Sequence, residues 1–167
     1  MTTAQVAFIA GFMTVSLAIL GVTLIVYRRA RIIDGGGHPT LINLWGLGRL
    51  PAERTEGNRW ASYLHRVTGI AIVLFLLLHL IDVSLFVWSV PVYDSVHSLY
   101  GTTIMRLFEC GLLFALCFHA FNGVRLIVID VWDIGMTGAL RGARLVLVVS
   151  VLLTIMGSVV ILWPVLS

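Results

Sequence analysis

The stretch SYLHRVTGIAIVLFLLLHLIDV, residues 62–83, joins a polar threshold to a long apolar run. A helix needs about 20 mostly apolar residues to cross the hydrocarbon core of a bilayer. His65 and Arg66 stand at the start of the run, and His79 stands inside it. Because a bilayer penalises these residue types, each of them needs a structural or functional reason. The stretch therefore predicts a membrane-spanning helix whose polar side chains have a structural or functional role.

The composition of the whole chain agrees with a membrane protein of one domain. Of its 167 residues, 59% are hydrophobic and only 11% are charged, whereas a soluble domain carries about a quarter charged residues. The net charge of +3 is small, so we expect no nucleic acid partner. Cys110 and Cys117 lie in an apolar run, and we interpret them as small core residues rather than as a disulfide or a metal site.

Four segments are long and apolar enough to span a membrane, which predicts an all-α transmembrane helix bundle. They are residues 6–27, 67–90, 107–132 and 145–163. The expected organisation is an N-terminal span over 1–30, a loop over 31–61 and a three-helix domain over 62–167. The Gly- and Pro-containing loop includes His38, which we expect to be solvated, as we do His97 in the loop after the second span.

Arginines set the expected orientation. They cluster between the first and second spans and again at Arg141 and Arg144, between the third and fourth, whereas residues 89–105 contain none. By the positive-inside rule, the arginine-rich segments are cytoplasmic and both termini lie outside.

His119 lies near the middle of the third span, with Gly123 four residues later on the same helix face. A missing side chain beside an imidazole lets a flat group lie close to the helix, which suits a haem held between helices. A neutral histidine hydrogen-bonded to a neighbouring helix is the alternative.

Spacings of three and four place Ser62, His65, Arg66 and Gly69 on one face at the entry to the second span. Arg offers a planar fork to haem propionates, and Ser62 with Arg66 could hydrogen-bond a quinone carbonyl. A rim arginine that reaches toward water, beside an interfacial histidine, is the alternative.

SYLHRVTG (62–69) together with HAFNGVR (119–125) resembles the paired signature of the cytochrome b membrane-anchor subunit of succinate dehydrogenase, S-x-x-H-R-x-[ST]-G followed by H-x-x-x-G-[IV]-R. The resemblance covers the chain from about Glu56 to its C-terminus. It implies that His119 is an axial haem ligand, that His65 and Arg66 lie at the haem propionates, and that Ser62 and Arg66 belong to a quinone site.

The same resemblance implies partners and cofactors. A second small membrane subunit would share haem b and the quinone pocket, and a flavoprotein with FAD and an iron–sulfur subunit would dock on the cytoplasmic side of a bacterial inner membrane. Electrons would pass from succinate to the quinone. Fumarate reductase, working in the reverse direction, a cytochrome b of another dehydrogenase, and a haem-free structural anchor are the alternatives.

Two features depart from the family pattern, and one histidine is left over. Leu126 stands where many relatives have histidine, and the first span is additional. We expect that span to brace the complex or to contact a neighbouring protomer in a higher oligomer.

His79 lies 14 residues beyond His65, about 21 Å along a helix. This position predicts that His79 is the ligand of a second haem, with a packing role as the alternative. Asp82 is then its hydrogen-bonding partner or faces water.

Overall fold

The computed structural model describes residues 1–33, 51–132 and 134–166, and the regular elements in these ranges are helical. They are α1 (Thr3–Ile33), α3 (Pro51–Trp88), α4 (Val90–His97), the short 3₁₀ helix η1 (Ser98–Gly101), α5 (Thr103–Val131) and α6 (Gly135–Leu166). Four segments are long and apolar enough to cross a membrane: Thr3–Ile25, Trp60–Trp88, Thr103–Val131 and Gly135–Pro164. The prediction of a four-span helical bundle is confirmed.

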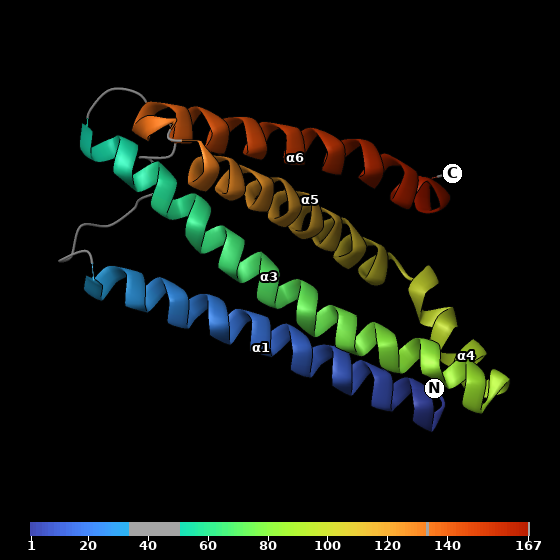
Figure 1. Cartoon of the computed structure of the whole chain (residues 1–167). Helices are drawn as coiled ribbons and strands as arrows, with labels where there is room; N and C mark the ends of the chain where they lie inside the picture. The colour runs from blue at the N-terminus through green and yellow to red at the C-terminus, as the bar shows by residue number, and fades with distance from the viewer. Residues whose placement is uncertain (34–50, 133, 167) are drawn as a thin grey trace.

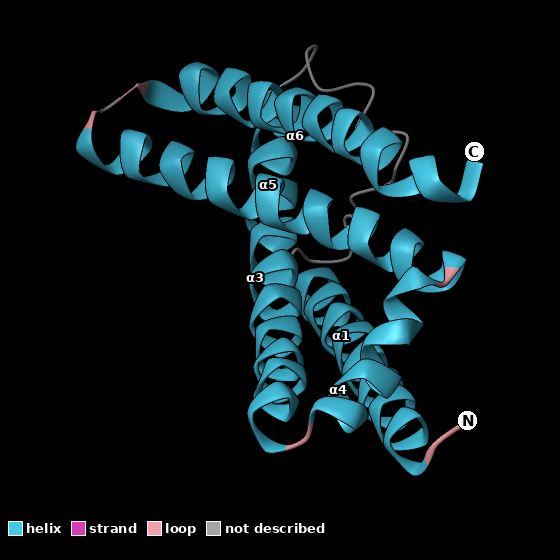
Figure 2. Cartoon of the chain, turned by 90° about the vertical axis from the view of Figure 1, so that its right-hand side faces the viewer, coloured by secondary structure: helices cyan, strands magenta, loops and turns pink. Residues whose placement is uncertain are grey.

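The helices lie in two pairs, α1 beside α3 and α5 beside α6 (Figure 1). Viewed from the side, the two pairs cross at an angle, and α3 packs against α5 where they meet (Figure 2). Both termini and α4 lie at one end of the bundle, which we call the α4 end (Figure 1). The opposite end carries Arg28, Arg66, Arg141 and Arg144, and we call it the arginine-rich end.

Two segments expected to be loops are helical. The second long helix, α3, begins at Pro51, well inside the loop expected over 31–61. Proline is tolerated in the first turn of a helix, where its missing N–H costs no bond. Pro91 likewise lies in the first turn of α4. Residues 34–50, including His38, lie outside the described residues.

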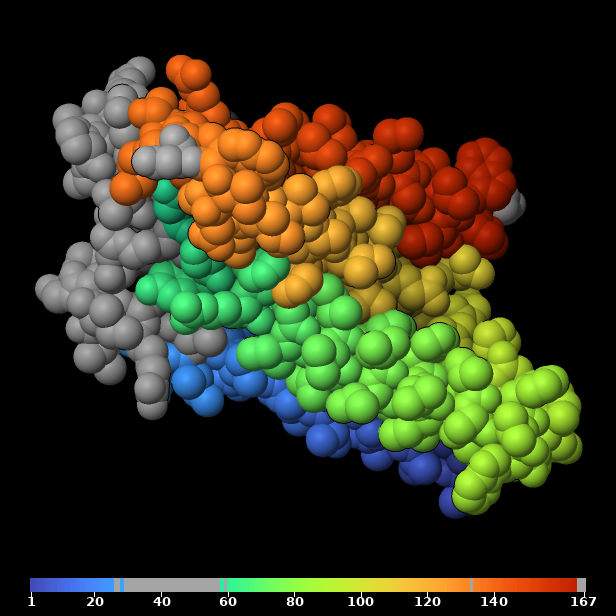
Figure 3. Space-filling model, in the orientation of Figure 1, coloured from blue at the N-terminus to red at the C-terminus, as the bar shows by residue number. Residues whose placement is uncertain are grey.

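Most apolar side chains face outward, as expected for helices in contact with lipid or partner subunits. In the space-filling view, α6 forms one edge of the molecule and α1 with α3 forms the other (Figure 3). At the α4 end, Phe8, Val96 and Met105 form a buried apolar cluster. The first span is therefore part of the bundle core at this end.

The extra first span packs closely on its own chain. A Cβ built on Gly11 would lie 3.5 Å from Leu78 Cδ1 of α3. The Phe12 ring packs edge-on against Phe108 of α5, with centroids 4.6 Å apart. The first span therefore packs on α3 and α5 of its own chain, and the expected contact with another protomer stays a prediction.

Candidate functional site

The two signature histidines meet at the contact between α3 and α5. The rings of His65 and His119 are stacked, with centroids 4.0 Å apart and an angle of 4° between their planes. His119 Nδ1 lies 3.0 Å from the backbone oxygen of His65 and 3.5 Å from Thr68 Oγ1. The structure thus brings together two of the predicted site residues from consecutive spans.

The hydrogen bond of His119 determines which ring nitrogen is free. A carbonyl oxygen can only accept, so Nδ1 carries the proton when His119 donates to the His65 carbonyl. The other nitrogen, Nε2, then presents a lone pair. A histidine that ligates a metal commonly donates its other N–H to a carbonyl group in this way, which fixes the orientation of the ring.

Glycines on both helices make room for the stacked rings. A Cβ added to Gly69 would lie 2.7 Å from His119 Cε1, much closer than a real Cβ allows. A Cβ on Gly123 would lie 3.6 Å from His65 Cε1, an ordinary contact. The sequence had singled out Gly123 as the open surface beside His119, but the glycine that His119 requires is Gly69 on the other helix.

The rim residues are less closely engaged. Ser62 Oγ donates to the backbone oxygen of Asn58, one turn earlier on its own helix, at 3.0 Å. Arg66 is exposed, one position after the half-buried His65. The Nδ1 atom of His65 is buried and has no hydrogen-bond partner within the described residues. This end of α3 therefore presents an unused imidazole nitrogen and an exposed guanidinium.

A buried arginine that the sequence analysis did not assign ties three helices together. Arg125 is 7% exposed. Its Nε donates to the Ala139 oxygen of α6 at 2.9 Å, and its two terminal nitrogens donate to Asn122 Oδ1, at 3.1 Å, and to Asn58 Oδ1 of α3. The available signal was an arginine inside an apolar run, since such a charge needs partners.

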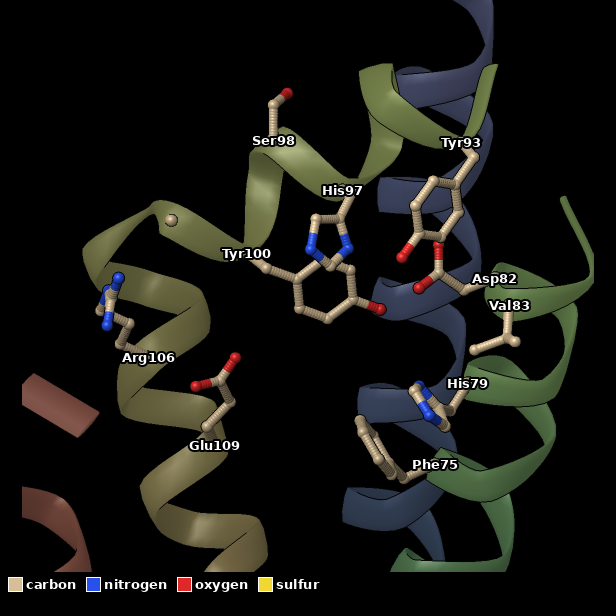
Figure 4. Close-up of a pocket in the computed structure, with 11 residues that line it drawn as sticks. Phe75, His79, Asp82, Val83, Tyr93, His97, Ser98, Tyr100, Arg106 and Glu109 are labelled. Atoms are coloured by element: carbon tan, nitrogen blue, oxygen red, sulfur yellow. The ribbon is translucent and has the colours of Figure 1, made fainter. Parts of the chain in front are cut away.

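The third predicted histidine, His79, lies in a separate cavity at the α4 end. The cavity has a volume of about 630 Å³, and His79 lies on its wall, stacked on Phe75 with ring centroids 5.8 Å apart. Figure 4 shows that α3 supplies one side of this cavity, α5 supplies Arg106 and Glu109 on the other, and α4 with η1 closes the top. His79 is therefore remote from the His65–His119 pair.

Asp82 does not face water, one of its two expected environments. It is 2% exposed, and the hydroxyl of Tyr100 faces it across the cavity wall (Figure 4). Burial, followed by the nearby carboxylates of Asp82 and Glu109, raises the pKa of Tyr100. Asp82 Oδ1 is buried and has no hydrogen-bond partner within the described residues. His97, expected to be solvated, is exposed but stacks on Tyr93 at the cavity wall.

Within the described residues, no three His, Cys, Asp or Glu side chains are grouped to hold a metal ion. A haem iron needs only one axial side chain on each side of the ring. A single histidine on a helix face is therefore enough for this chain to contribute one axial ligand to a haem iron.

These features define a helical membrane protein with histidines between its spans. Residues 49–161 match the family of the succinate dehydrogenase/fumarate reductase transmembrane subunit, and the chain belongs to this family. It is a membrane-anchor subunit of that class of oxidoreductase, and membership implies association with the other subunits of the complex.

Two relatives support the same assignment. The succinate dehydrogenase 2 membrane subunit SdhC of Mycobacterium tuberculosis is 38% identical over 91 residues, which cover 53% of this chain and 67% of the relative. The succinate dehydrogenase hydrophobic membrane anchor subunit of Halobacterium salinarum is 39% identical over 72 residues, which cover 42% of this chain and 55% of the relative. No solved structure matches the chain significantly. The family match begins at residue 49 and so leaves α1 outside it.

The glycine contacts lead to a first prediction. Gly69→Ala gains helix propensity, but its methyl group meets His119, so we expect the free energy of unfolding to fall by about 1–3 kcal/mol through overpacking. Thermal unfolding of the purified complex measures this. Gly123→Ala is the matched control, because its Cβ fits at 3.6 Å; equal stability of the two variants would contradict the contact.

The Arg125 bonds lead to a second prediction. Lysine keeps the charge of Arg125 but has no planar fork, so Arg125→Lys leaves acceptors on Asn58, Asn122 or Ala139 unpaired. We expect a loss of about 1–3 kcal/mol in the free energy of unfolding. The control is Arg141→Lys at an exposed position. If both variants unfold at the parent temperature, Arg125 does not join the helices.

Proposed function

We propose that this chain is the haem b-binding anchor subunit of a succinate:quinone oxidoreductase. The observation that carries the proposal is the hydrogen bond from His119 Nδ1 to the His65 carbonyl, which leaves Nε2 free to ligate iron. The closeness of Gly69 holds this ring in one orientation. A second membrane subunit would supply the opposite axial histidine.

His65 and Arg66 are the residues we assign to the haem propionates. His65 Nδ1 is without a partner in the described part of the chain, and Arg66 is exposed beside it. Both side chains can donate hydrogen bonds to a carboxylate. Bound haem b would supply a one-electron carrier whose potential depends on its ligands and on burial.

Ser62 and Arg66 are one helical turn apart at the same end of α3, and we assign them to the quinone site. A hydroxyl and a guanidinium can donate hydrogen bonds to a quinone carbonyl and stabilise negative charge on it during reduction. Partner subunits carrying FAD and iron–sulfur clusters would deliver the electrons taken from succinate.

We assign a second haem b to the α4-end cavity, with His79 as its ligand. His79 lines a cavity of about 630 Å³ whose walls include Phe75 and Tyr93. It lies 14 residues from His65 in one continuous helix, about 21 Å along the axis. Haems at the two ends would together span the membrane.

The proposed setting is a bacterial inner membrane. The arginine-rich end would face the cytoplasm, where the soluble subunits dock, and both termini would lie outside. The two termini do lie at the α4 end of the bundle (Figure 1), whereas Arg28, Arg66, Arg141 and Arg144 lie at the other end.

The haem-free structural anchor has one observation in its favour. His119 is already hydrogen-bonded and stacked on His65 within the chain, as a histidine that only joins two helices would be. The content of haem in the purified complex decides between the two functions.

A third prediction follows for haem content. We expect two haems b per flavin by pyridine haemochrome, one in His79→Ala, and loss of the other in His119→Ala. Leu17→Ala, at an outward-facing position of α1 away from both histidines, is the control and should keep both. One haem per flavin in the parent complex would show that His79 only packs against its neighbours. No haem at all would contradict haem binding and favour the haem-free structural anchor.

A fourth prediction concerns Arg66, an exposed side chain whose removal opens no buried cavity. We expect Arg66→Ala to lower the rate of quinone reduction by about 10- to 1,000-fold, as loss of a charge-stabilising donor does. Succinate oxidation with a soluble artificial acceptor should be unchanged. Arg141→Ala, exposed at the same end, is the control, and an equal loss of both activities in Arg66→Ala would assign Arg66 to assembly.

A further inference from the structure

The first turns of α1 are hydrogen-bonded to α4. Gln5 Nε2 donates to the backbone oxygen of Ser95 at 2.8 Å and to Ser98 Oγ at 3.4 Å. Thr2 Oγ1 donates to Ser95 Oγ at 3.3 Å. These bonds join residues 90 or more positions apart in the sequence, so the first turns of α1 hold the connection between the second and third spans.

The first turns of α1 also pack against apolar side chains of α4 and η1. Phe8 is 9% exposed and forms the buried cluster with Val96, which is fully buried, and Met105. The Phe8 ring lies against Tyr100 of η1, with centroids 5.7 Å apart. Tyr100 is thus held from behind by α1 while its hydroxyl faces Asp82 (Figure 4).

Helices as short as α4, with eight residues, and η1, with four, are not stable without tertiary contacts. Their position over the cavity therefore depends on what they pack against, and α1 supplies much of that surface. Figure 4 shows α1 running directly behind the cavity residues Tyr93, Tyr100 and Asp82.

We propose that the first two turns of α1 form a clamp that holds Tyr100 on Asp82 and so positions the wall of the α4-end cavity for its ligand. Tyr100 is a positioning residue here, because it acts through Asp82, three residues from His79 on α3. Since α1 lies outside the region that matches the family, this gives a role to the extra span. The ligand is the second haem, so the functional part rests on the function proposed above.

The clamp itself can be tested without any haem measurement. In the purified complex, Thr2→Cys with Ser95→Cys places two sulfurs near positions where the oxygens are 3.3 Å apart, within reach of a disulfide after a small adjustment. We expect rapid cross-linking under mild oxidation, identified by peptide mass spectrometry. Thr14→Cys with Ser95→Cys, about three turns further along α1, should not cross-link.

Weakening the clamp should slow this cross-link. We expect Phe8→Ala to slow it at least several-fold and Gln5→Ala, a milder change that leaves the apolar cluster intact, to slow it less. Leu17→Ala, at an outward-facing position of α1, should leave the rate unchanged. Failure of the first pair to cross-link, or equal rates in all variants, would overturn the clamp.

The functional part is tested by redox titration of the haem that His79→Ala removes. Tyr100→Phe removes the hydroxyl that faces the Asp82 carboxylate, so more negative charge is felt in the cavity, and we expect the midpoint potential of that haem to fall. Phe8→Ala should shift the same haem, and the oxidised Thr2→Cys/Ser95→Cys pair should reverse the shift. The other haem and the Leu17→Ala complex should keep the parent potentials.

The outcomes separate the two proposals. A single haem in the parent complex would contradict the proposal of a second haem. The cross-linking rates would still test the proposal that α1 forms a clamp. Two haems with unchanged potentials in Tyr100→Phe and Phe8→Ala would overturn the positioning role and leave the proposed haem binding intact.

Discussion

The contact on which the bundle depends is a histidine ring seated on a glycine. Gly69 of α3 leaves space that His119 of α5 fills so closely that even a methyl group would lie 2.7 Å from the ring. Small residues let membrane helices approach, because lipid provides no hydrophobic force to drive them together. The approach also brings His119 to the His65 carbonyl and stacks the two imidazoles. The same contact therefore determines both how α3 packs on α5 and how the ring of His119, the proposed haem ligand, is oriented.

Some buried polar atoms of the bundle have several hydrogen-bond partners and others have none within the described residues. Arg125 donates to groups on α3, α5 and α6, so its charge is shared among neutral acceptors. By contrast, His65 Nδ1, Asp82 Oδ1 and Arg106 Nε are buried without partners in the described residues. Trp60 Nε1, Asn122 Nδ2 and Ser150 Oγ are the other such atoms. A buried polar atom without a hydrogen-bond partner lowers the stability of the fold. A bound ligand that hydrogen-bonds to His65 Nδ1, Asp82 Oδ1 or Arg106 Nε would remove this cost.

Hydropathy predicted the four spans because it is a local signal, whereas only the resemblance to the family signature implied that His65 and His119 belong to one site. Helix α4 was missed because eight residues are too few for a helical period to be recognised in the sequence. The pairing of Tyr100 with Asp82 crosses a turn whose geometry no spacing rule describes, so Asp82 was left with two possible environments. Arg125 was visible as a charge in a span, but its acceptors on three helices follow only from the packing.

The two candidate sites depend on different parts of the chain. The His65–His119 pair is built by α3 and α5 alone, both within the residues that match the family. The wall of the α4-end cavity also needs α4 and η1, which pack against α1. The additional span can therefore affect the second cavity while leaving the first site intact. This physical separation explains how a family signature can be retained over residues 49–161 while the preceding helix packs at the other end of the bundle.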